Sequence, residues 1–233
     1  MRKVSRLRHE LRAAASKQKA GTLRRFFKTG PGEYGEGDEF LGVMVPQSRA
    51  IARRFGDLPL ADVRRLLRSR IHEERLVALL ILVDRFRKGG PEDRREVYDL
   101  YLRNTSHINN WDLVDLSAEH VVGPYLDGRS RGVLRRLAQS SSVWERRIAV
   151  LATFHFIKRG EFGQTLRLAE RLLDDEHDLI HKAVGWMLRE VGKRDQRALE
   201  GFLRGHGQRM PRTMLRYAVE RLPAARRRRY LQR

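Results

Sequence analysis

The chain has 233 residues, of which 49 are Lys or Arg and 29 are Asp or Glu, and its formal net charge is +20. Apolar residues make up 41% of the sequence, which is enough to build a folded core and excludes an intrinsically disordered chain. Cysteine is absent, which excludes disulfides and cysteine-ligated zinc or iron–sulfur sites.

A positive charge of this size destabilises a compact protein by self-repulsion unless a polyanion is its usual partner. Nucleic acid is the first candidate for that partner, and an anionic membrane surface is the second. No apolar run approaches the length of about 18 residues that crosses a membrane. The basic N-terminus also lacks the continuous apolar segment of a secretory signal. We therefore expect an intracellular protein, in the cytoplasm and associated with nucleoid DNA.

The N-terminal segment differs from the rest of the chain. Residues 1–20 are rich in Lys and Arg and contain neither Pro nor Gly, which predicts one basic amphipathic helix. Residues 30–39 combine glycines with acidic residues and predict a loop. A short apolar segment over residues 40–46 follows this loop and leads into a predicted helix over Ser48–Phe55.

From residue 58 onward the pattern is helical. Leu58–Val63 has the composition of a helix start. The apolar run over residues 76–83 contains more apolar side chains than one helix face can hold, which predicts a helix that packs on two sides. Gly89–Pro91 ends that helix, because two glycines and a proline continue a helix only at a high cost. Similar breaks follow at residues 123–124, 160, 192, 205–207 and 211. Period-two strand patterning is largely absent between them, so we predict an all-α fold.

A cation or an indole recurs at the start of the apolar helices with a spacing of 34–36 residues, at Arg75, Trp111, Arg147, Lys182 and Arg216. A period of about 35–45 residues that holds two helices is typical of helical-repeat solenoids. We predict one HEAT-like helical-repeat domain over residues 1–233, with a concave basic face lined by the second helix of each pair. A single globular bundle is the alternative, because few identities recur between the copies. The arginine run near the C-terminus predicts a frayed basic tail over residues 224–233.

The three tryptophans of the chain, Trp111, Trp144 and Trp186, all lie near the start of a predicted inner helix beside charged residues. Trp111 and Asp115 are four residues apart, so on a helix they share one face with about 5–6 Å between their Cβ atoms. An aromatic face and a carboxylate both attract cations. This pair predicts a site for a cationic group next to nucleic acid. Core packing of each tryptophan, and an ion pair between Asp115 and Arg147, are the structural alternatives.

Other motifs carry less information. Asn109 and Asn110 precede a predicted helix, and Asn is a favoured capping residue. His177 and His181 have a spacing that can bind a metal, but the sequence offers no agreed third ligand, and we expect no metal site. A phosphate-binding loop of the pattern GxxxxGK(S/T) is absent, so nucleotide hydrolysis is unsupported.

Four segments, taken in order, resemble the AlkD-like DNA alkylation-repair glycosylases: residues 40–46 followed by Arg49, then 110–115, 144–149 and 182–190. The resemblance runs from about residue 20 to about residue 220. It implies HEAT-like repeats whose concave, basic surface binds duplex DNA, in agreement with the repeat pattern. It also implies hydrolysis of the N-glycosidic bond of N3- and N7-alkylated purines without a metal or cofactor. A monomer is expected for this architecture.

The resemblance makes Asp115 the catalytic carboxylate. By matching motifs it also implies lesion contacts at Trp111, Trp186 and Tyr34, a contact of Arg147 with the DNA backbone or the abasic sugar at the lesion, and DNA-backbone contacts at Lys182 and Arg189. Met44 stands where some members carry a polar residue. Because an open repeat surface offers no deep pocket, we expect the lesion to be read at the surface of the duplex.

Two further classes of function compete with a glycosylase. A non-catalytic DNA-binding HEAT-repeat scaffold would recognise damaged or bent duplex through the same surface and release no base. A protein-interaction adaptor would bind no DNA, and the charge of +20 argues against it. The carboxylate of Asp115 separates the first two classes, because only catalysis requires it.

Overall fold

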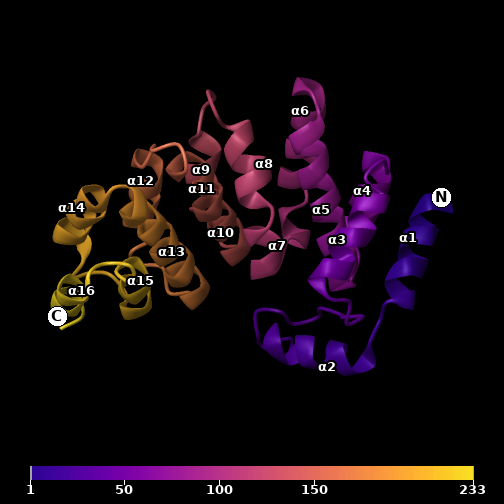
Figure 1. Cartoon of the computed structure of the whole chain (residues 1–233), viewed down its shortest axis with the longest axis horizontal. Helices are drawn as coiled ribbons and strands as arrows, with labels where there is room; N and C mark the ends of the chain where they lie inside the picture. Colours follow the sequence, from indigo (N-terminus) through magenta and orange to yellow (C-terminus); the bar gives the residue numbers. More distant parts are fainter. Residues whose placement is uncertain (1, 233) are drawn as a thin grey trace. The chain divides into compact units, whose positions relative to one another are not determined.

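The computed structural model describes residues 2–232, without the side chain of Arg2. Apart from one isolated bridge between Glu39 and Ile71, the regular structure of these residues is helical (Figure 1). This confirms the predicted all-α class. The chain divides into two compact units, residues 1–121 and 122–233. The predictions of a single domain and of a concave basic face depend on how the two units are arranged, so they stay predictions.

The helices of the first unit are α1 (Arg2–Ala13), α2 (Lys17–Phe26), α3 (Val45–Arg54), α4 (Leu60–Leu67), α5 (His72–Lys88), α6 (Pro91–Leu102), the 3-10 turn η1 (Thr105–His107) and α7 (Trp111–Asp115), and α8 (Ala118–Tyr125) crosses the boundary. The central helix is α5, which packs against α3, α4 and α6 and also contacts α1 and α7. Its side chains from His72 to Leu79 are all buried. The predicted helix that packs on two sides is therefore confirmed.

Residues 1–20 do not form one helix, because the chain leaves the helical path between α1 and α2. Contacts with a later segment fix this break: the backbone N–H of Ser16 donates to the carbonyl of Leu41 at 2.9 Å. Gly42 has a φ of +83°, and a Cβ at this position would lie only 2.2 Å from the Ser16 carbonyl oxygen. The Ser16 side chain then caps α2 by accepting a hydrogen bond from its first turn. Met1 lies outside the described residues.

The second unit is built around α13. Its helices are α9 (Gly132–Leu137), α10 (Val143–Ala152), α11 (Phe154–Ile157), α12 (Gly163–Arg171), α13 (Asp178–Arg194), α14 (Gln196–His206), α15 (Arg212–Ala218) and α16 (Ala224–Leu231). The central helix packs against α10, α11, α12, α14 and α15. Gly185 permits its close approach to α15, because a Cβ there would lie 2.5 Å from the backbone oxygen of Met214.

A helix replaces the predicted frayed C-terminal tail. Residues 224–231 form α16, on which Tyr230 is buried. Arg212 donates to the carbonyl of Leu231 at 2.6 Å, and Arg226 forms an ion pair with Glu200 at 2.7 Å. These contacts with α15 and α14 stabilise a segment whose arginine run alone predicts no fixed structure. Arg233 lies outside the described residues.

Arg75 of α5 and Arg146 of α10 make the same pair of contacts near the start of their helices, so this pair of repeated cations differs by one residue from the predicted pair of Arg75 and Arg147. Arg75 Nη1 donates to the carbonyls six and five residues before it, at 2.9 and 3.1 Å. Arg146 Nη1 makes the same two contacts, at 3.0 and 2.9 Å. The equivalent of Arg75 is therefore Arg146 rather than Arg147. In both places the guanidinium closes the turn that precedes the helix.

Candidate nucleic-acid and catalytic site

Trp111 and Asp115 are the first and last residues of α7. Asn110 caps this helix, and its side-chain oxygen accepts a hydrogen bond from Trp111 N at 2.8 Å, which confirms its predicted capping role. Leu113 and Val114, between the two, are fully buried and anchor the helix. Trp111 and Asp115 are both half-buried, so α7 holds an indole and a carboxylate one turn apart where solvent reaches them.

Trp111 belongs to a cluster of aromatic rings. Phe27 stacks on the indole with 5.2 Å between ring centroids, and Phe26 meets it edge-on at 5.7 Å. Phe27 also stacks on Phe40 at 5.3 Å. Phe27 is buried, but Phe26 is 60% exposed. An exposed ring beside an indole provides a platform on which a base or a cation can stack.

Asp115 lies near the buried Tyr101 of α6. Burial raises the pKa of the Tyr101 hydroxyl, its hydrogen bond to Ser117 at 2.9 Å lowers it, and the negative charge of Asp115 raises it again. The phenol is therefore neutral around physiological pH.

A buried polar network lies beneath the aromatic cluster. His72 is 2% exposed, and its two ring nitrogens contact two carboxylates: Nδ1 lies 3.0 Å from Asp38 Oδ2, and Nε2 lies 2.9 Å from Asp112 Oδ2. The rings of Phe40 and Phe27 lie against the imidazole, at centroid distances of 4.5 and 5.0 Å. Since Asp112 is the second residue of α7, the network extends from the start of α5 to the helix that carries the candidate site.

Asp38 accepts hydrogen bonds from several donors of this network. Arg75 Nη2 donates to its Oδ1 at 2.7 Å, and Asn110 Nδ2 donates to its Oδ2 at 3.4 Å. Burial raises the pKa of Asp38, but the hydrogen bond to His72 and the charge of Arg75 outweigh burial and hold that pKa below its ordinary value of 3.8. Burial likewise lowers the pKa of His72, but the hydrogen bond and charge of Asp112 and the hydrogen bond to Asp38 raise it to about 8. At neutral pH a protonated imidazole therefore lies between two carboxylates.

Glu73, the residue after His72, anchors the chain that follows the loop. Its carboxylate is buried and accepts hydrogen bonds from the backbone N–H groups of Leu41, Gly42 and Val43 at distances of 2.8 to 3.2 Å. A buried carboxylate needs such donors, because an unpaired buried charge is strongly unfavourable. Two consecutive side chains of α5 thus hold both ends of the segment that passes under the aromatic cluster.

Tyr34 lies in the glycine-rich loop, and its ring is half-buried with Lys28 Nζ 6.0 Å from the ring centroid. Its role in lesion binding stays a prediction. Phe26 is the exposed one of the two phenylalanines that contact Trp111, and it was not predicted from the sequence. Its signal was a pair of consecutive phenylalanines between Arg25 and Lys28, an unusual apolar pair in a basic segment. The exposed cations of this segment of the chain are Lys17, Lys19, Arg24, Arg25 and Lys28.

The second unit holds the other predicted site residues on α10 and α13. Trp186 is half-buried and meets Phe154 edge-on at 6.0 Å. Arg147 is only 5% exposed, and its Nη1 donates to the carbonyl of Leu179 at 2.6 Å. The guanidinium that we assigned to the DNA backbone or the abasic sugar therefore also ties α10 to the start of α13.

The two predicted DNA-backbone cations, Lys182 and Arg189, lie two turns apart on α13 and are both half-buried. Lys182 forms an ion pair with Asp178 at 2.7 Å. Arg189 pairs with Glu220 and lies 3.7 Å from Glu190. Within this unit the structure thus brings Trp186, Lys182 and Arg189 onto one helix. Their convergence with the residues of α7 stays a prediction.

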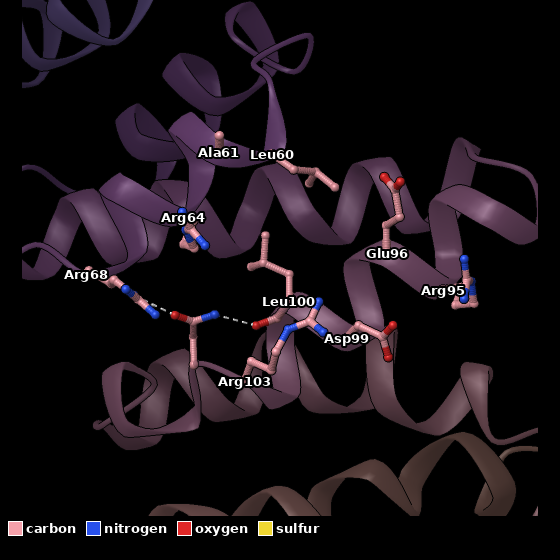
Figure 2. Close-up of a pocket in the computed structure, with 10 residues that line it drawn as sticks. Leu60, Ala61, Arg64, Arg68, Arg95, Glu96, Asp99, Leu100 and Arg103 are labelled. Atoms are coloured by element: carbon pink, nitrogen blue, oxygen red, sulfur yellow. Dashed lines mark hydrogen bonds between the residues drawn. The ribbon is translucent and has the colours of Figure 1, made fainter.

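Two pockets lie away from these residues. One, of about 500 Å³, opens between α4 and α6, and Figure 2 shows Arg64 of α4 and Arg68, which follows α4, opposite Arg95 of α6 and Arg103, which follows α6. Arg68 is held by the buried side chain of Asn104, which accepts its hydrogen bond at 2.8 Å. The other pocket, of about 740 Å³, lies between α9 and α12. The predicted site residues line neither of the two.

The histidine pair on α13 has structural roles. His177 caps the helix by accepting a hydrogen bond from Leu179 N at 3.1 Å, and His181 Nε2 contacts the carbonyl of Asp175. Among residues 2–232 no group of three or more His, Asp or Glu side chains is placed to hold a metal ion. In the same part of the chain, no helix combines the length and the apolar character needed to cross a membrane.

The chain is similar to proteins of alkylation repair. A family model described as "DNA alkylation repair enzyme" matches residues 7–222. A solved structure described as a "predicted DNA alkylation repair enzyme" from Enterococcus faecalis superposes with a TM-score of 0.70 at 15% sequence identity, and the match covers 90% of this chain and 97% of that chain. No curated protein matches the chain. At this identity the structural similarity shows the fold, whereas the family match covers most of the sequence.

Proposed function

Because this chain belongs to the family of DNA alkylation repair enzymes, we propose that it is a DNA glycosylase for N3- and N7-alkylated purines in duplex DNA. A role in alkylation repair follows from the family. The reaction, hydrolysis of the N-glycosidic bond between the alkylated base and deoxyribose, is our proposal. The observation that carries it is the placement of Trp111 and Asp115, both half-buried, at the two ends of α7, with the exposed ring of Phe26 in contact with Trp111.

The chemistry of the lesion suits this pair of side chains. Alkylation at N3 or N7 gives the purine a positive charge, so the base leaves without first being protonated. As the C1′–N bond breaks, positive charge develops on the sugar, as in other glycoside hydrolyses. A carboxylate near C1′ stabilises that charge and can orient or deprotonate the attacking water. We assign these roles to Asp115.

The aromatic rings supply the preference for charged lesions. The face of an indole attracts a cation by about 0.5–2 kcal/mol, depending on how far the pair is removed from water. A neutral purine gains stacking but not this electrostatic term. We assign Trp111 and Trp186 to the lesion, and Arg147, Lys182 and Arg189 to the phosphates and the sugar. Under this proposal Tyr34 is a further lesion contact.

The test is base release from a duplex that carries one N7-methylguanine, followed by alkaline cleavage of the abasic site. We expect Asp115→Asn to slow single-turnover release by about 10²–10³-fold, the usual loss when one electrostatic stabiliser of a transition state is removed. Binding to the same duplex should stay within a few-fold of the wild type. The matched control is Asp99→Asn, since Asp99 is also a half-buried aspartate of the first unit.

The result also separates the glycosylase from the DNA-binding scaffold. If the wild-type protein binds the duplex and releases no base above the uncatalysed rate, the scaffold is correct. If Asp115→Asn releases base at the wild-type rate, the protein is a glycosylase but the carboxylate lies elsewhere.

A further inference from the structure

We propose that His72 is a positioning residue of the site: by bridging Asp38 and Asp112 it fixes the first turn of α7, and with it the placement of Trp111 and Asp115. The inference rests on the proposed function, because it concerns the same site. His72 itself contacts neither the substrate nor the reacting atoms. It acts through α7, the helix that carries Trp111 and Asp115.

The length of α7 makes such an anchor necessary. A helix of five residues has little stability of its own, because nucleating the first turn fixes several residues for a single hydrogen bond. Asp112 supplies the anchor through both of its oxygens. Its Oδ1 accepts a hydrogen bond from Leu113 N at 2.8 Å, inside the helix, while its Oδ2 lies 2.9 Å from His72 Nε2. The first turn of α7 is thereby tied to α5, the most buried helix of the unit.

The protonation state of His72 decides whether this bridge is complete. A protonated imidazole has two N–H donors, one for each carboxylate, whereas neutral imidazole has one donor and one acceptor. On losing its proton, His72 turns a lone pair toward Asp38 or Asp112 at about the distance of a hydrogen bond, and that contact becomes repulsive.

The charged groups around His72 come from three elements. Asp38 faces it from the loop and Asp112 from α7, and both stabilise the imidazolium, whereas Arg75, from α5 itself, opposes it. Glu73 is occupied by the three backbone N–H groups of residues 41–43. Since the pKa of His72 is raised from 6.5 to about 8, the bridge is fully formed below pH 6.5 and is lost as the pH rises through about 8.

The first test follows the position of Trp111 without any substrate. In a protein carrying Trp144→Phe and Trp186→Phe, Trp111 is the only tryptophan. We expect its fluorescence to change between pH 6 and 9.5 with a midpoint near 8, and the change to be absent when His72→Gln is added. Emission from Trp111 that stays constant over this range would overturn the proposal, whether or not the variant folds.

The second test measures single-turnover release of N7-methylguanine against pH, corrected for spontaneous loss of the base. The wild-type rate should fall above pH about 8, and His72→Gln should lower the rate at pH 7 by about 10–10²-fold, the usual effect of a small misplacement of catalytic groups. The dissociation constant for the duplex should change by less than about threefold, because positioning affects the chemical step. Asp112→Asn should likewise lower the rate at pH 7 and leave the dissociation constant nearly unchanged.

The control is His206→Gln, since His206 also lies against a phenylalanine ring, that of Phe202, but on α14 of the second unit. It should leave the rate and its pH dependence unchanged. A folded His72→Gln protein with the wild-type rate and pH profile contradicts the proposal. If the wild-type protein releases no base at any pH but Trp111 shows the transition near pH 8, positioning by His72 holds and the proposed function fails.

Discussion

Phe26 combines two properties that core residues do not share: it contacts Trp111, and it is 60% exposed. An exposed aromatic residue gains nothing for folding by staying in water, but it can stack on a base. It also lies between exposed cations of α2 and Lys28, which attract a phosphate backbone. We therefore expect the loss of Phe26 to weaken DNA binding with little effect on folding.

We predict that Phe26→Ala weakens binding to a duplex carrying N7-methylguanine by about 5–150-fold, the equivalent of the 1–3 kcal/mol that one stacked base contributes. The melting temperature should change by no more than about 2 °C, since little buried area is lost. Fluorescence anisotropy gives the dissociation constant. Tyr34→Ala is the comparison, and a larger loss for Tyr34→Ala than for Phe26→Ala would place the lesion at the loop instead.

At the scale of elements, the contact between α13 and α15 depends on one missing side chain. The Cβ that Gly185 lacks would lie 2.5 Å from the backbone oxygen of Met214 and 2.6 Å from Tyr217 Cβ. Neither atom can move away as the end of a flexible side chain could, so the two helices would have to separate. Since α13 also carries Trp186, Lys182 and Arg189, their positions depend on this packing.

We predict that Gly185→Ala lowers the free energy of unfolding by about 1–3 kcal/mol, the usual cost of overpacking a core. Denaturation with urea measures it. Gly205→Ala in α14 is the matched control, because a Cβ at Gly205 meets no atom within 4 Å and alanine favours the helix. A gain or no change in stability for Gly185→Ala would show that α15 can shift at no cost.

At the scale of the whole molecule, we expect the charge of +20 to govern binding to DNA. Cations that neutralise phosphates release condensed counterions, so affinity falls steeply as salt is added. If the protein neutralises about six to ten phosphates, its affinity for an undamaged duplex should fall by about 10³–10⁵-fold between about 50 and 200 mM salt. The slope of the logarithm of the dissociation constant against the logarithm of salt concentration measures the number of contacts. A protein-interaction adaptor would show no such dependence, and a flat slope would reject the DNA surface.

The sequence by itself determined the features that depend on short spacings. The nearly continuous apolar run over residues 76–83 specified a helix buried on two sides, because the spacing of apolar residues shows how many faces of a helix are buried. Asn110 specified the start of α7, and the four-residue spacing of Trp111 and Asp115 placed both on one face of it. The all-α class followed from the same local patterns.

Only the tertiary structure decided which distant residues meet. The break between α1 and α2 depends on Leu41 and Gly42, and the arginine-rich C-terminal segment is helical because Tyr230 is buried and α14 and α15 hold it. His72 meets carboxylates 34 and 40 residues away along the chain. Periodicity and capping signals act over one or two turns of helix, whereas a hydrogen bond across 40 residues exists only once the core has brought its two partners together.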